Sequence, residues 1–171
     1  MKTTRIAALA ALAMIAAGNA LASDIEINIT GKVENTTCQV NSTTGIYVRA
    51  VALETVTTNA LSQAGKTAGR KDEAFDITGC EASRTGVTLQ FDNKENYSAD
   101  GRLINTASGG ASNVEIQLLN GNAPVNLNTD TPAFVVSNGA AQLPLAFQYY
   151  ATGAATEGDV TSQLMISLIY K

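Results

Sequence analysis

Apolar and polar residues alternate with a period of two through most of this chain. The pattern occurs in residues 25–30, 75–77, 87–91, 114–118 and 164–170, where apolar side chains occupy every second position. Successive side chains of a β-strand point to opposite faces of a sheet, so this alternation is typical of strands with one buried face. The sequence therefore predicts an all-β protein.

Turn residues separate several of these stretches. Asn120-Gly121 and Asn138-Gly139 are pairs that tolerate the positive φ angles of tight hairpin turns. Pro144 lies inside the apolar stretch 143–150, and since proline donates no backbone hydrogen bond, it predicts an edge or a bulge there.

The remaining stretches are polar or mixed. Residues 63–72 and 93–110 are rich in Gly, Ser, Asn and charge, and they are predicted to be surface loops. Residues 50–62 are compatible with a short helix or with a strand. About seven short strands separated by turns predict an antiparallel β-sandwich of immunoglobulin-like type in a single domain.

The first 22 residues have the features of a signal peptide. Lys2 and Arg5 are followed by an apolar run at 6–17 and by small residues at Ala20 and Ala22. Cleavage after Ala22 leaves nine basic and fifteen acidic side chains, a net charge of -6. We therefore expect an exported, acidic protein, which is a poor partner for nucleic acid.

The residue inventory disfavours enzyme chemistry. The chain has no histidine and two cysteines, so histidine-based nucleophilic systems and four-thiolate metal sites are excluded. No catalytic residue, cofactor or metal is expected. Cys38 and Cys80 form either the one disulfide that an exported chain allows or two free thiols, and their wide separation favours the disulfide.

Both ends of the chain after residue 22 are strand-like. Residues 23–30 form an alternating stretch before Gly31, and the apolar series that ends at Tyr170 continues almost to the last residue. A sheet that ends in this way exposes unpaired backbone groups along its edge. We expect a strand from another source to cover that edge.

Several short motifs are spread over the chain after residue 30. They are Gly31–Val33, Cys38–Val40, Phe75–Ile77, Cys80, the run 147–156, Gly158 and Tyr170. With these motifs the chain resembles the pilin subunits of bacterial chaperone/usher fimbriae of the type 1 kind. In that family a glycine fourteen positions from the end accompanies a penultimate aromatic residue, and Gly158 and Tyr170 match both.

The resemblance implies an incomplete immunoglobulin-like β-sandwich that lacks its final strand and is completed by donor-strand addition. Residues 1–22 are then the signal peptide, 23–30 the donor-strand extension and 31–171 the pilin domain. Ile25, Ile27 and Ile29 are the predicted donor side chains. The predicted groove edge and chaperone contact consists of Gly158, Leu164, Ile166, Leu168, Tyr170 and Lys171.

The implied partners are neighbouring pilin subunits, a periplasmic chaperone and an outer-membrane usher, with a host receptor contacted only through the assembled fimbria. The expected location is the cell surface, reached through the periplasm. The expected function is that of a structural fimbrial subunit that supports cell adhesion. The alternative is a minor, tip or adaptor subunit with an adhesive role.

One feature departs from the family pattern. Residues 23–30 are fewer than the ten or more that usually precede the first domain strand in this family. A shorter donor strand, an earlier cleavage site or a minor subunit would each account for the difference.

Overall fold

A computed structural model of the chain describes residues 38–171, which form two antiparallel β-sheets and two short 3-10 helices. In this part of the chain no helix is long and apolar enough to cross a membrane. The elements are β1 (Gln39–Val40), η1 (Thr58–Leu61), β2 (Thr67–Thr78), β3 (Gly86–Asp92), η2 (Lys94–Asn96), β4 (Leu103–Ile104), β5 (Val114–Asn120), β6 (Ala123–Val125), β7 (Ala133–Val135), β8 (Ala141–Ala151) and β9 (Met165–Tyr170).

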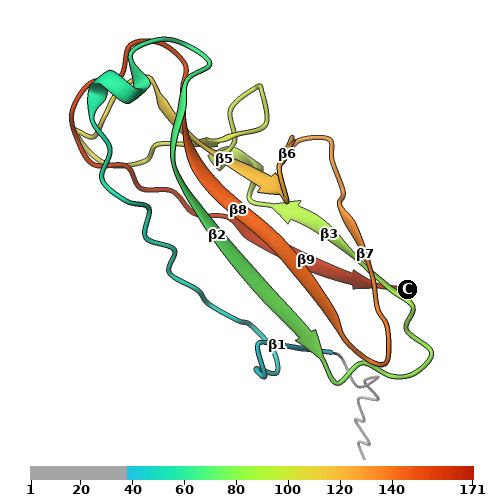
Figure 1. Ribbon diagram of the computed structural model, residues 1–171. Helices are drawn as coiled ribbons and strands as arrows, with labels where there is room; N and C mark the ends of the chain where they lie inside the picture. Colours follow the sequence, from blue (N-terminus) through green and yellow to red (C-terminus); the bar gives the residue numbers. More distant parts are fainter. Residues whose placement is uncertain (1–37) are drawn as a thin grey trace, which may run out of the picture. The chain divides into compact units, whose positions relative to one another are not determined.

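The larger sheet is built around its two longest strands. Its order is β1-β2-β8-β5-β4, with β6 added to β5. β2 and β8 lie side by side over their whole length in Figure 1, with pairs running from Thr67 opposite Tyr150 to Ile77 opposite Ala141. A register shift between Ala68 and Lys71 places a bulge near the start of β2.

The smaller sheet has the order β7-β3-β9. The pairs Val87–Tyr170, Leu89–Leu168 and Phe91–Ile166 place the apolar members of β3 and β9 on the same face. This face packs against the larger sheet and forms the main core with it. The predicted all-β sandwich is confirmed, and the core results from the period-two alternation of both strands.

The core contains branched aliphatic side chains from both sheets. Its largest fully buried members are Ile77, Val87, Leu89, Leu118, Leu127, Leu143 and Leu145. Each such side chain stabilises the fold by roughly 1.5–3 kcal/mol relative to exposure in water.

The loop predicted over residues 63–72 is partly wrong, because β2 already begins at Thr67. The first half of β2 is mostly polar and exposed, so it lacks the alternation by which a strand is detected in sequence. Its backbone pairing with β8 holds this part of the chain as a strand, although few of its side chains are buried. In the ambiguous region 50–62, the only regular element is the 3-10 helix η1.

Pro144 lies in a central strand, so the prediction of an edge or bulge is wrong. It pairs with Ala74 of β2, one position beyond the last pair that β8 makes with β5, Leu145 with Asn120. Its carbonyl oxygen accepts a hydrogen bond from the N–H of Gly121 in the β5–β6 turn. Pro144 thus lies just beyond the last β5–β8 pair, where the absence of its N–H removes no hydrogen bond from the paired part of the ladder.

Cys38 and Cys80 form a disulfide, as expected. Cys38 immediately precedes β1, and Cys80 lies two residues after the end of β2. β1 and β2 pair over only two residues, and the disulfide adds a covalent link between the start of β1 and the end of β2.

Candidate functional site

β9 is an edge strand whose outer side pairs with no described strand. Lys171 and Gly86 exchange two backbone hydrogen bonds, of 2.9 and 3.3 Å, at the end of the β3–β9 ladder. Hydrogen-bonded and non-bonded pairs alternate along an antiparallel ladder. The backbone N–H and C=O groups of Ile166, Leu168 and Tyr170 therefore point away from β3, toward the free edge.

A second segment, residues 45–53, runs opposite this edge and is called the facing segment here. No backbone hydrogen bond joins it to any other described residue. It is tied to β2 through side chains: the Arg49 guanidinium lies 3.1 Å from the Glu73 carboxylate, and Tyr47 packs edge-on against Phe75 at 6.3 Å between ring centres. In Figure 1 it runs beside β2 as an extended trace without a strand arrow.

β9 and the facing segment form the two walls of a groove of about 770 Å³. Core residues of both sheets form its floor, of which Phe75 and Ile116 remain half-buried. The floor residues are Phe75, Ile77, Leu89, Leu103, Ile116, Leu143, Leu145 and Phe147. An open apolar groove with unpaired backbone on its walls is suited to bind an extended strand.

Four of the predicted groove-edge residues, Leu164, Ile166, Leu168 and Tyr170, line this groove. They remain only half-buried although they face the core, because nothing in the described chain covers the groove. Partial burial raises the pKa of Tyr170 above its usual value of 10.0. Lys171 follows at the end of the same edge and is exposed.

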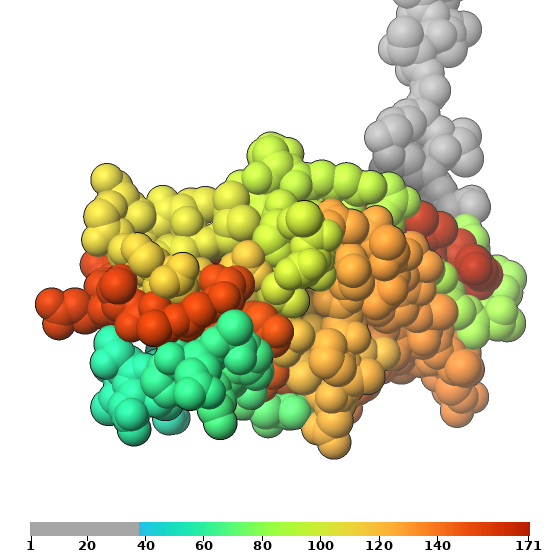
Figure 2. All heavy atoms as spheres, turned by 90° about the horizontal axis from the view of Figure 1, so that it is seen from above, coloured from blue at the N-terminus to red at the C-terminus, as the bar shows by residue number. Residues whose placement is uncertain are grey.

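Gly158 lies elsewhere. A Cβ atom at this position would come within 2.5 Å of the Ala111 backbone nitrogen, so Gly158 permits close packing of two loops. Figure 2 shows residues 152–160 beside residues 105–112 and the η1 region at one end of the domain. Leu61, Ala111, Val114 and Ala151 form a second apolar cluster there.

Ile25, Ile27 and Ile29 lie outside the described residues, as do the predicted boundaries after residues 22 and 30. The sequence does not predict the facing segment as part of the site. Its sequence is apolar at nearly every position, which obscures a period of two. The structure exposes Ile46 by 90% and Val48 by 85%, and large exposed apolar side chains often mark interaction surfaces.

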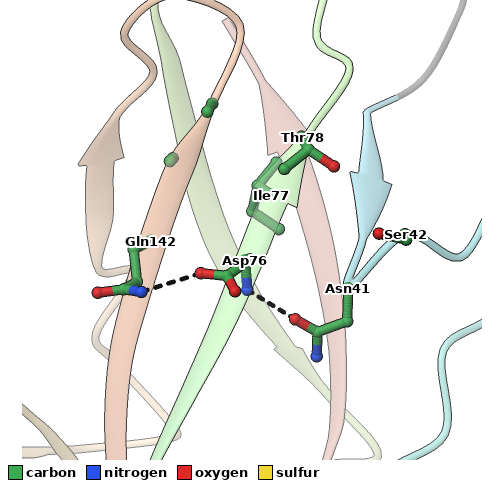
Figure 3. A pocket seen from close by; sticks show the side chains of 8 residues that line it. Asn41, Ser42, Asp76, Ile77, Thr78 and Gln142 are labelled. Atoms are coloured by element: carbon green, nitrogen blue, oxygen red, sulfur yellow. Dashed lines mark hydrogen bonds between the residues drawn. The ribbon is translucent and has the colours of Figure 1, made fainter.

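A shallower hollow lies between β1, β2 and the start of β8, and its polar groups bond to one another. Figure 3 shows Asp76 between two partners: Gln142 Nε2 donates to Asp76 Oδ1 at 2.9 Å, and Asp76 N–H donates to Asn41 Oδ1 at 2.8 Å. These contacts join the β1 turn to the larger sheet.

Tyr97 gives the domain a pH dependence that can be measured. Its hydroxyl donates to the Asp92 carbonyl oxygen, and burial, with the nearby Asp92 and Glu95 carboxylates, raises the pKa of Tyr97 from 10.0 to about 12. Between these values the unfolded chain binds fewer protons than the native one, so stability falls as pH rises above 10. Urea unfolding at pH 9, 10 and 11 should show this fall, and Tyr97→Phe should make it shallower. An unchanged slope in the variant would assign the effect to other groups, such as Tyr149 and Tyr170.

The sandwich with one open edge belongs to a known class of protein. The family model described as "Fimbrial protein" matches residues 27–171, and the chain belongs to that family. Among its relatives, the major fimbrial subunit SMF-1 of Stenotrophomonas maltophilia is 38% identical over 160 residues, covering 87% of this chain and 94% of that protein. The F17 fimbrial protein of Escherichia coli is 38% identical over 174 residues, covering 94% of each.

Solved structures show the same fold at lower sequence identity. The P pilus rod subunit PapA superposes with a TM-score of 0.61 at 15% identity, covering 78% of this chain and 99% of that one. A subunit of a chaperone-usher pilus, solved to explain rod uncoiling, superposes with a TM-score of 0.65 at 14% identity, covering 85% and 94%. The fold is therefore that of chaperone-usher pilus subunits.

Proposed function

We propose that this protein is a structural subunit of a bacterial surface fimbria and that it polymerises by donor-strand exchange. Residues 23–30 of one subunit enter the groove of the next, with Ile25, Ile27 and Ile29 directed to its floor. The observation that carries this proposal is the open groove between β9 and the facing segment, whose apolar β9 wall is only half-buried.

The chemistry of the groove fits an alternating strand. Backbone groups of β9 supply a hydrogen-bonding edge, and the floor accepts apolar side chains at every second position of the incoming strand. Burial of each isoleucine contributes roughly 1.5–3 kcal/mol before the costs of association are subtracted. Together the three isoleucines contribute roughly 4.5–9 kcal/mol before those costs.

Before assembly the same groove needs protection, because an unpaired apolar edge promotes aggregation. We infer that a periplasmic chaperone covers the edge from Leu164 to Lys171 during export and that an outer-membrane usher receives the complex. The names of the relatives, which include a major fimbrial subunit, favour a shaft subunit over a minor or tip subunit. Cell adhesion then belongs to the assembled fibre.

A peptide of residues 23–33 tests the proposal. Added in excess to the purified protein from residue 23 onward, it should raise the melting temperature by roughly 5–10 °C, because a ligand at 100 times its Kd stabilises by about 2.7 kcal/mol. The matched control is the same peptide carrying Ile27→Asp, which should have no effect. Equal effects of both peptides, or none from either, would contradict groove binding by this segment.

A further inference from the structure

The connection from β8 to β9, residues 152–164, contains no helix or strand and leads directly into one wall of the groove. Its last three residues, 162–164, already line the groove before β9 begins at Met165. β9 itself pairs with β3 alone among the described strands. The position of this wall therefore depends on what holds the end of the connection.

Asn105, which directly follows the edge strand β4, holds that end through its side chain. Its Oδ1 atom accepts from the N–H of Thr161 at 2.9 Å and from the N–H of Ala107 at 3.1 Å. Its Nδ2 atom donates to the carbonyl oxygens of Asp159 and Ala111, both at 2.9 Å. An asparagine amide has two donor hydrogens and an oxygen with two lone pairs, so its whole hydrogen-bonding capacity is used here.

Both backbone groups of Thr161 are held by the two residues that follow β4. Its N–H donates to the asparagine, and its carbonyl oxygen accepts from the Thr106 N–H at 2.8 Å and the Thr106 hydroxyl at 3.0 Å. The hydroxyl of Ser162, the next residue, is buried without a hydrogen-bond partner among the described residues, so it adds no anchor. One longer contact follows, at 3.3 Å from Asn96 Nδ2 to the Gln163 carbonyl oxygen. Thr161 is thus the strongest anchor point before the groove.

The contacts of Asn105 and Thr106 with residues 159–161, called the Asn105 clasp here, join the two sheets. Asn105 continues from β4 of the larger sheet, whereas Thr161 leads into β9 of the smaller sheet. The facing segment is also tied to the larger sheet, through Arg49 and Glu73. Both walls of the groove are therefore anchored to the same sheet.

Two glycines leave room for the clasp. A Cβ atom on Gly110 would overlap the Asp159 carbonyl oxygen and lie 2.9 Å from Asn105 Nδ2. Gly158 allows the close contact with Ala111 described above. The close approach of the two loops thus brings the end of the connection within reach of Asn105.

We propose that Asn105 is a positioning residue for the groove, because it fixes the start of the β9 wall at the distance from the facing segment that an incoming strand requires. This inference rests on the proposed function. Asn105 does not line the groove, so it acts through Thr161 and the residues that follow. A groove that is formed before binding avoids the cost of ordering its wall when the strand enters.

Binding of the peptide of residues 23–33 to the protein from residue 23 onward reports the state of the groove. Asn105→Ala removes all four side-chain hydrogen bonds and should weaken binding about tenfold, the loss expected if the groove keeps its form in about a tenth of the molecules. Thr106→Val removes only the hydroxyl bond to Thr161 and should weaken binding about two- to fivefold. Urea unfolding of each variant gives its folded fraction, so affinities are compared per folded molecule.

The matched control is Thr156→Val. Thr156 Oγ1 accepts from the Ser112 N–H at 2.8 Å, so this variant loses a bond between the same two loops, but one that lies earlier in the connection. Peptide affinity should stay within about twofold of the parent, because the lost bond shares no partner with Thr161. Amide hydrogen exchange in β9 gives a second readout: it should become faster in Asn105→Ala and stay unchanged in Thr156→Val.

The outcomes separate this inference from the proposed function. If Asn105→Ala and Thr106→Val bind the peptide as Thr156→Val does, or if exchange in β9 is unchanged, the positioning role is overturned and strand binding by the groove is left intact. Thr106→Val retains Asn105 and every backbone bond, so it decides the question even where Asn105→Ala does not fold. A parent protein that does not bind the peptide contradicts the proposed function and, with it, this inference.

Discussion

Replacement of Ile27 by aspartate is expected to yield a subunit that folds and is exported but forms no fibres with itself. Ile27 is the central member of the donor alternation, so the new carboxylate would be buried in an apolar groove whose lining cation, Arg49, already pairs with Glu73. Burial of an unpaired charge costs several kcal/mol, which exceeds the contribution of the isoleucine it replaces. Electron microscopy of cells and gels of sheared fibres would measure the loss.

The matched control is Asn28→Asp, which adds the same charge at the neighbouring, outward-facing donor position. Its fibres should form at near-normal levels. Normal fibres from Ile27→Asp, or equal losses in both variants, would show that residues 23–30 do not act as the donor.

A second copy of residues 23–33, appended after Lys171 through a short Gly/Asn turn, is expected to produce a stable monomer. A tight turn after Lys171 returns the chain along the free edge of β9, so the appended strand can enter its own groove. Burial of three isoleucines should raise the melting temperature by at least about 10 °C over the unextended protein. Calorimetry would measure the shift, and size-exclusion chromatography the loss of oligomers.

An appended copy that carries aspartate in place of each isoleucine is the control, and it should melt like the unextended protein. A rise in both proteins would indicate a nonspecific effect of chain length. If neither protein is stabilised, the groove does not accept this strand in an intramolecular arrangement.

The sequence predicted those strands whose two faces differ. Alternation located β3, β5 and β9, and it placed Leu164, Ile166, Leu168 and Tyr170 along one line, which the structure shows as a groove wall. It failed for the start of β2, where polar residues occupy both faces and long-range pairing with β8 determines the structure.

The groove itself could not be derived from local pattern. Its second wall, the facing segment, has apolar residues on both sides and lacks a backbone ladder to any described residue, so neither periodicity nor propensity marks it. Gly158 shows the limit of prediction from a family motif. The resemblance predicted Gly158 at the groove edge, whereas the structure places it where two loops approach each other closely, next to Gly110 and Ala111.

The disulfide has a mechanical consequence in a fibre joined by donor strands. A pull on the fibre reaches each domain through the residues that connect the donor segment to Cys38. The two-residue β1 ladder alone would peel apart under such a load, one hydrogen bond after another. The Cys38–Cys80 bond instead passes the force covalently to the end of β2, which pairs with β8 over most of its length.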